Sequence, residues 1–124
     1  MRHAMTFLYL AALANVASGA DAPHRTESQL LKSYAISQCI ARAYPDSPVS
    51  ADAKAAAAGF LEFGSVDPEA YSEIVALADE ALGKQYLGKG GEPLHVMKCI
   101  DLLFDKRLAD VVEKYPGRGP TGGR

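Results

Sequence analysis

The first twenty residues constrain this 124-residue chain most, because they decide how much of it folds and in which compartment. Arg2 and His3 give a short basic start, Met5 to Val16 form a mostly apolar run, and Ser18-Gly19-Ala20 ends it with small residues. This pattern is typical of a secretory signal peptide cleaved after residue 20, with cleavage after residue 22 as the second choice. A buried amphipathic helix would need a polar face, which the run lacks. The run is also shorter than the roughly 20 apolar residues of a transmembrane helix, so we expect export without a membrane anchor.

Removal of residues 1–20 leaves about one hundred residues, which suffices for one small domain with a modest core. We expect this domain over residues 21–116, followed by a disordered tail over residues 117–124 that is rich in glycine. The chain has 13 Lys and Arg against 15 Asp and Glu, a formal net charge of -2. Nucleic acid is therefore not an expected partner.

Cys39 and Cys99 are the two cysteines of the chain. In a protein that leaves the reducing cytosol, an intramolecular disulfide is the expected state of such a pair. Closing a loop of roughly 60 residues stabilises a fold by about 2 to 4 kcal/mol if the bridge is unstrained.

The apolar residues recur at helical intervals, and neither a strand pattern nor an internal repeat is found. The chain is therefore predicted to be all-α, a single small bundle of five helices. The expected helices cover residues 27–44, 51–63, 68–86, 93–104 and 106–115.

Start signals support four of these helices. Thr26 with Gln29 has the spacing of a capping box, and Asp67 precedes a proline at the first helical position. Ser50 is expected to cap the alanine-rich second helix, and Asp105 the last. Pro45 and Pro48 are expected to stop the first helix and form a turn.

Side-chain faces follow from the same spacing. The first helix is expected to expose Lys32, Ser33, Ser37 and Arg42. The fourth is expected to bury Val96, Met97, Cys99, Ile100, Leu103 and Phe104 and to expose His95, Lys98 and Asp101.

Two features stand out as candidate binding surfaces. The segment Gly88-Lys89-Gly90-Gly91-Glu92 combines three glycines with two charges, so we expect a loop that protrudes or is mobile. It lacks the spacing of a phosphate-binding loop. The third helix has a markedly acidic exposed side, formed by Glu69, Glu73, Asp79 and Glu80.

Chemical functions find little support in the residues. A thiol enzyme would need a free Cys99 beside His95, but Cys99 has an obvious disulfide partner. A zinc site from Cys39, His95, Cys99 and Asp101 lacks the usual short ligand spacings. The carboxylates of the third helix have nothing nearby to raise a pKa for acid–base work. We therefore predict no catalytic residues, no metal and no cofactor, and a binding protein as the simplest interpretation.

The residues carry a family resemblance over nearly all of the mature chain. Its most specific parts are the two segments that contain Cys-Ile pairs. In these the chain resembles the type VI secretion amidase immunity proteins, in the branch partnered with the fourth amidase effector family. The matching segments are residues 31–44, Tyr71, residues 97–102 and residues 108–115.

The resemblance implies a periplasmic, disulfide-containing homodimer that blocks a peptidoglycan amidase delivered by neighbouring or sister cells. In such a homodimer a helix of one subunit grips the effector, while a protruding loop of the other fills its cleft. On this basis we predict the effector-binding residues to be Gly88, Lys89, Gly90, Gly91 and Glu92 in the loop, and Glu69, Glu73 and Glu80 in the third helix. An acidic contact surface predicts a locally basic effector surface.

One other class of function stays open at this point. A small exported helical domain could serve as a carrier of an apolar molecule or as a chaperone-like binding protein. That function predicts an apolar cavity.

Overall fold

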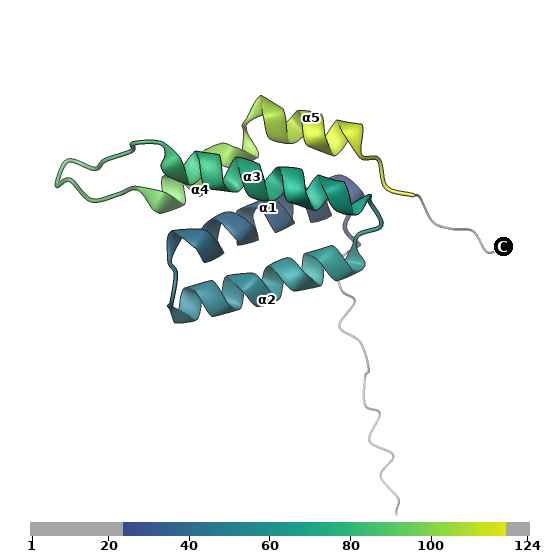
Figure 1. The fold of residues 1–124 in the computed structure, drawn as a ribbon, viewed down its shortest axis with the longest axis horizontal. Coiled ribbons are helices and arrows are strands. Elements are labelled where there is room, and N and C mark those ends of the chain that lie inside the picture. Colours follow the sequence, from purple (N-terminus) through teal and green to yellow (C-terminus); the bar gives the residue numbers. More distant parts are fainter. Residues whose placement is uncertain (1–23, 119–124) are drawn as a thin grey trace, which may run out of the picture.

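The structure is a computed structural model that describes residues 24–118, and these form five helices and a long projecting loop (Figure 1). The predicted all-α class is confirmed, since the described residues contain no strand and only one isolated β-bridge. The predicted signal peptide lies outside the described residues. No helix within residues 24–118 is long and apolar enough to cross a membrane. The helices are α1 (Glu27–Ala43), α2 (Pro48–Phe63), α3 (Pro68–Gly83), α4 (His95–Leu103) and α5 (Lys106–Lys114).

Helix α1 is the centre of the bundle and contacts all four other helices. It can do so because it buries side chains around much of its circumference, including Leu31, Ala35 and Cys39. Helix α2 lies along one side of α1, and α3 and α5 along the other (Figure 1). The small residues Ala53 and Ala57 are the apolar side chains that α2 buries, so these two helices can approach closely.

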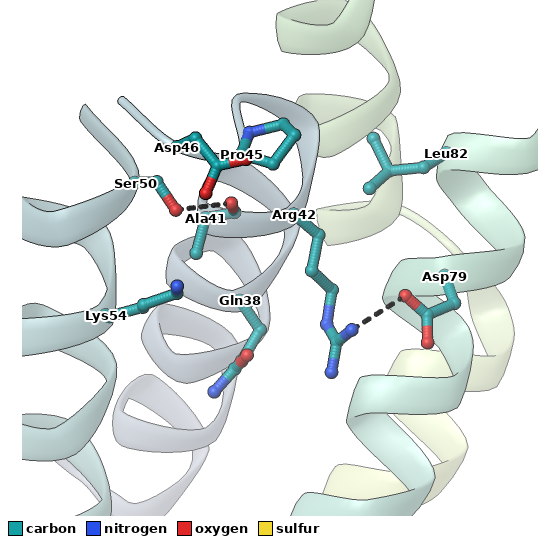
Figure 2. A pocket seen from close by; sticks show the side chains of 9 residues that line it. All are labelled: Gln38, Ala41, Arg42, Pro45, Asp46, Ser50, Lys54, Asp79 and Leu82. Atoms are coloured by element: carbon teal, nitrogen blue, oxygen red, sulfur yellow. Dashed lines mark hydrogen bonds and ion pairs between the residues drawn. The ribbon is translucent and has the colours of Figure 1, made fainter. Parts of the chain in front are cut away.

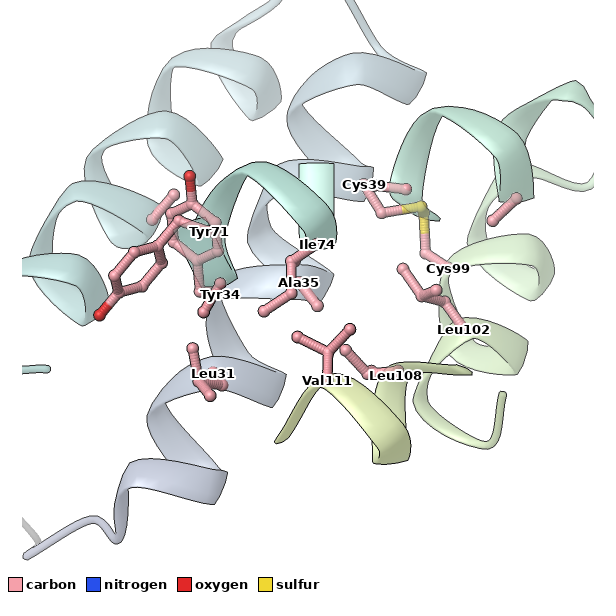
Figure 3. Packing of buried hydrophobic residues seen from close by; sticks show 14 of the residues in the cluster. Leu31, Tyr34, Ala35, Cys39, Tyr71, Ile74, Cys99, Leu102, Leu108 and Val111 are labelled. Carbon is pink, nitrogen blue, oxygen red and sulfur yellow. A yellow bond between two sulfur atoms is a disulfide. The ribbon is translucent and has the colours of Figure 1, made fainter. Parts of the chain in front are cut away.

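The core joins α1, α3, α4 and α5 (Figure 3). Ile74, Leu102 and Leu108 are almost completely buried, and the Tyr34 and Tyr71 rings pack edge to face with centroids 4.9 Å apart. The predicted disulfide between Cys39 and Cys99 is confirmed. It ties α1 to α4 across a separation of 60 residues, and both cysteines are buried.

Three of the predicted helix starts are confirmed in atomic detail. The Thr26 hydroxyl accepts the Gln29 amide at 3.1 Å, and the Gln29 side chain accepts the Thr26 amide at 2.8 Å, which completes the capping box of α1. The Asp67 carboxylate accepts the amide of Glu69, and that of Asp105 accepts the amide of Arg107. These caps depend only on residues close in sequence, which explains why the sequence predicts them.

The predicted start of α2 was wrong by one turn. Ser47, not Ser50, caps the helix, and Pro48 occupies its first turn, where a missing amide costs nothing. The Ser50 hydroxyl instead donates to the carbonyl oxygen of Ala41 at 2.7 Å. In a continuing helix that oxygen would accept the amide of residue 45, but Pro45 has none. Ser50 therefore caps the end of α1 rather than the start of α2.

Both helix ends beside the glycine-rich segment also differ from the prediction. Helix α3 ends at Gly83 rather than near Tyr86, and α4 begins at His95 rather than Pro93. The connecting loop is correspondingly longer, at residues 84–94. The additional residues form its paired stem.

Part of the prediction for α4 is confirmed, since Cys99 is buried and Asp101 is exposed, but five other residues lie on the wrong side. Lys98 is buried with 6% exposure, whereas Val96, Met97 and Ile100 are about half exposed and Phe104 is 82% exposed. The Cys39–Cys99 bridge and the burial of Leu102 fix the rotation of α4 about its axis. Ser37 of α1, also expected at the surface, is buried.

The first two residues of the predicted tail are in contact with the bundle. The amide of Arg118 donates to the Ser65 hydroxyl at 3.2 Å, and a side chain at Gly117 would overlap that of Glu27. Glu27 in turn accepts the Ser65 hydroxyl at 2.6 Å. Residues 119–124 lie outside the described residues, and the division of the chain into signal peptide, domain and tail stays a prediction.

Candidate functional site

The loop over residues 84–94 projects away from the bundle as a narrow hairpin (Figure 1). Gly88 donates its amide to the Glu92 carbonyl at 2.8 Å, and the amide of Gly91 donates to the Gly88 carbonyl at 2.9 Å. Leu87 and Pro93 form an isolated antiparallel bridge next to this turn. The predicted protrusion is confirmed, and its backbone hydrogen bonds give it a defined shape.

The tip of this hairpin needs glycine at particular positions. Gly91 has a φ of 82°, a conformation that side-chain-bearing residues rarely adopt. The Glu92 carboxylate folds back over Gly88 and Gly90, where any Cβ atom would displace it. Lys89 is exposed. A cation and a backbone turn therefore form the end of the projection.

The stem of the hairpin is fastened to the helices on both sides. The Leu94 amide donates to the Tyr86 carbonyl at 3.1 Å. The Lys98 side chain donates to the Leu82 carbonyl at 3.0 Å, in the last turn of α3. The interaction of the Tyr86 hydroxyl with the Asp101 carboxylate raises the pKa of the tyrosine. No sequence pattern predicted these contacts, because they join residues from α3, the loop and α4.

The acidic side of α3 is less free than the sequence suggests. Glu73 accepts the Lys114 ammonium at 2.7 Å and the Tyr115 hydroxyl at 2.6 Å, and these hydrogen bonds lower the pKa of its carboxyl group. Glu80 pairs with the Arg107 guanidinium at 2.6 Å. Glu69 is exposed. Helix α5 thus turns the predicted acidic surface into one of mixed charge.

The predicted effector-binding residues do not form one patch on a single chain. Glu69 lies in the first turn of α3 and the hairpin begins at its last residue. At about 1.5 Å per residue, the two ends are roughly 20 Å apart. Glu80, one turn from the end of α3, is the predicted carboxylate nearest the hairpin.

A polar groove lies between α1, α2 and α3 (Figure 2). It has a volume of about 480 Å³, and Arg42 crosses one side to pair with Asp79 at 3.2 Å. Gln38, Asp46 and Lys54 also line it. Charged walls of this kind do not suit an apolar ligand, so this groove gives the carrier hypothesis no support.

The candidate thiol and metal residues are held in other roles. Cys39 and Cys99 form the disulfide, and the described residues contain no free cysteine. The His95 ring packs against the Tyr44 ring with centroids 5.8 Å apart. Among residues 24–118, no three His, Cys, Asp or Glu side chains gather where they could hold a metal ion.

An apolar surface on α4 is a feature that the sequence analysis assigned to the core. Val96, Met97, Ile100 and Phe104 are spaced at helical intervals along one face and are each about half exposed or more. A shallow pocket of about 270 Å³ lies beside it, lined by Ile36, Phe60 and Leu103 among others. Exposed apolar side chains gathered in this way are typical of a surface that contacts another protein.

Comparison with known proteins agrees with the fold and the resemblance. Residues 29–112 match the family model described as Tai4, type VI secretion system amidase immunity protein. A chain in the structure of the Tae4/Tai4 effector–immunity system from Salmonella typhimurium is 37% identical, with a TM-score of 0.69 over 73% of this chain and 89% of that one. A structure described under new type VI-secreted toxins and self-resistance proteins in Serratia marcescens has a TM-score of 0.68 at 19% identity, over 96% of this chain and 90% of that one. Among curated proteins no significant match is found.

The Serratia structure supports the fold alone at its level of identity. The family model covers most of the chain, and the Salmonella chain matches it at 37% identity. The members of this family are immunity proteins rather than enzymes, and the effector with which the solved relative is paired is Tae4. The chain therefore belongs to the Tai4 family of type VI secretion system amidase immunity proteins.

Proposed function

We propose that this protein acts in the periplasm and inhibits a Tae4-type peptidoglycan amidase by filling its active-site cleft with the hairpin over residues 84–94. The observation that carries this proposal is the hairpin itself, a narrow projection with a defined backbone at one end of a disulfide-braced bundle. A peptidoglycan amidase must admit a peptide substrate into a groove, and a projection that fills the groove excludes it. No chemical step by the inhibitor is needed.

The shape of the tip favours binding in a groove. Hydrogen bonds across Gly88, Gly91 and Glu92 fix the turn before any partner binds. A preformed loop loses less conformational entropy on binding than a mobile one, so more of its contact energy appears as affinity. We propose Gly88 to Glu92 as the residues that enter the cleft, with Lys89 as the charged contact.

The exposed side of α3 is proposed as the second contact surface. Because Glu73 and Glu80 are already paired with α5, the partner surface that fits them carries both signs of charge rather than a basic patch alone. The separation of Glu69 from the hairpin fits a complex in which one subunit supplies α3 and the other the hairpin.

A homodimer is proposed on the apolar face of α4. Phe104 is 82% exposed and lies directly after Leu103, which lines the shallow pocket beside Ile36 and Phe60. A two-fold axis places the same projection and the same pocket on both subunits, so each Phe104 can enter the pocket of its partner. Phe104→Asp should yield a folded monomer, as measured by light scattering after gel filtration. A variant that stays dimeric would show that the interface lies elsewhere, and a parent protein that is monomeric would refute the dimer.

The location follows from the predicted signal peptide. The signal peptide would deliver the inhibitor to the compartment that contains peptidoglycan, where an oxidising environment allows the Cys39–Cys99 bridge to form. Co-expression with a Tae4-type amidase directed to the periplasm tests this. Protection from lysis by the full chain, and not by a chain lacking residues 1–20, supports it; protection by both forms contradicts it.

Deletion of Lys89 to Gly91 tests the mechanism directly. We expect the thermal melt to stay nearly unchanged, because these residues are outside the core, while the inhibition constant rises by roughly 100-fold, as for loss of a dominant contact. Lys54→Ala, an exposed residue of α2, serves as the control. Full inhibition by the deletion variant would exclude the hairpin from the mechanism.

A further inference from the structure

Lys98 is a buried cation in a position that local sequence does not explain. It is the fourth residue of α4, with 6% exposure, and its ammonium group donates to the Leu82 carbonyl at 3.0 Å. A lysine is rarely buried to this extent unless a polar partner compensates the lost hydration. The partner here is the end of another helix.

The last turn of α3 contains no cation, and Lys84, its capping residue, is exposed just beyond it. The last turn of a helix leaves carbonyl groups without amide partners and carries a partial negative charge, which a nearby cation stabilises. Helix α3 has no basic residue in its last turn. Lys98 supplies that charge from α4, across the base of the hairpin.

The same residue also holds the other end of the loop. The backbone amide of Lys98 donates at 3.1 Å to the carbonyl of Leu94, the capping residue just before α4. The side chain of Lys98 therefore reaches the last turn of α3, two residues before the loop begins, and its main chain reaches the last residue of the loop.

We infer that Lys98 is a positioning residue for inhibition: its ammonium group fixes the direction of the hairpin relative to α3, and so presents the tip in the orientation that enters the effector cleft. The inference rests on the proposed function. A second contact supports this inference, since the Leu94 amide donates a hydrogen bond to the Tyr86 carbonyl inside the stem. Asp101, one turn beyond Lys98, faces the Tyr86 hydroxyl and raises its pKa.

Loss of the Lys98 ammonium group is expected to lower the fraction of molecules that hold the hairpin in the binding orientation, and to leave the contacts between the hairpin tip and the effector unchanged. When only a fraction of the molecules hold the hairpin in the binding orientation, the apparent dissociation constant rises by the inverse of that fraction. Lys98→Met keeps most of the buried stem and removes the ammonium group. It should therefore loosen the hairpin without emptying the core.

Amide hydrogen exchange in the free protein tests the fixing role without any partner. We expect Lys98→Met to speed exchange at the hydrogen-bonded amides of Gly88, Gly91 and Leu94 by at least about tenfold, and to leave that of the core residue Ile74 little changed. Lys54→Met is the matched control. Equal acceleration at Ile74 would indicate general destabilisation, and no acceleration in the hairpin would show that Lys98 does not fix it; either result overturns the inference.

Inhibition of a Tae4-type amidase from the bacterium that encodes this chain gives the second readout. The inhibition constant of Lys98→Met should rise by the inverse of the fraction of molecules that keep the hairpin in the binding orientation, with the tip residues Gly88 to Glu92 intact. Faster exchange with an unchanged inhibition constant would refute the role in binding. If deletion of Lys89 to Gly91 leaves inhibition intact, the proposed mechanism fails, whereas the exchange measurement still decides whether Lys98 fixes the hairpin.

Discussion

Reduction of the Cys39–Cys99 disulfide is the perturbation whose cost can be worked from the structure most directly. The bridge joins two buried residues 60 positions apart, and reduction removes the covalent tie while keeping every heavy atom. In the chain-entropy model, a closed loop of that length lowers the entropy of the unfolded chain by roughly 14 cal/mol/K, which is about 4 kcal/mol at 25 °C. This is a large share of the 5 to 15 kcal/mol typical of a whole domain.

The assay is equilibrium unfolding in urea, followed by circular dichroism at 222 nm, with and without a phosphine reductant. The protein should be unfolded during reduction, since both sulfurs are buried. We expect the free energy of unfolding to fall by about 4 kcal/mol and the melting temperature by roughly 15 to 30 °C. The variant with Cys39→Ala and Cys99→Ala should respond to the reductant not at all.

A difference below about 1 kcal/mol between the oxidised and reduced forms would refute the reasoning. The unfolded reduced chain would then have to retain structure that offsets its greater freedom.

Three further outcomes follow from single contacts. Ser50→Ala removes the donor to the Ala41 carbonyl, and since that buried oxygen has no other amide to accept, we expect a loss of about 1 to 3 kcal/mol in urea unfolding; a loss of under about 0.5 kcal/mol would contradict its capping role. Glu73→Gln removes the partner of Lys114. Because the pKa of Glu73 in the folded protein lies below its ordinary value of 4.5, the stabilising effect of its carboxylate is complete above that pH and is lost as the pH falls through the folded pKa. The melting temperatures of parent and variant should therefore converge on acidification, and a difference that stays constant down to about pH 2 would exclude this origin. Gly91→Ala places a side chain at a φ of 82° and should weaken amidase inhibition while leaving the melting temperature within a few degrees, whereas unaltered inhibition would show that the turn geometry is not needed.

Export and the compartment of action were inferred from residues 1–20 and stay predictions. The structural contribution to that question is the disulfide, which the sequence predicted from export and the structure confirmed. A buried, fully formed bridge is what a protein of an oxidising compartment is expected to contain.

The sequence determined the number and most boundaries of the helices because these depend on groups within four residues of each other. The capping box of Thr26 and Gln29 and the Asp67-Pro68 start act locally, and both were predicted and found. Where a cap depended on a contact between two different helices, the prediction failed. Ser50 was expected to cap the helix that follows it, but it caps the carbonyl that Pro45 leaves free at the end of the helix before it.

Tertiary structure decided which sides of α4 are covered. That helix is apolar on more than one side, so periodicity alone does not select the face that packs. The bond from Cys99 to Cys39 and the burial of Leu102 set its rotation, which turns Phe104 outward. Lys98 enters the interior because the open end of α3 lies there and accepts its charge, a partner sixteen positions away that no local pattern could reveal.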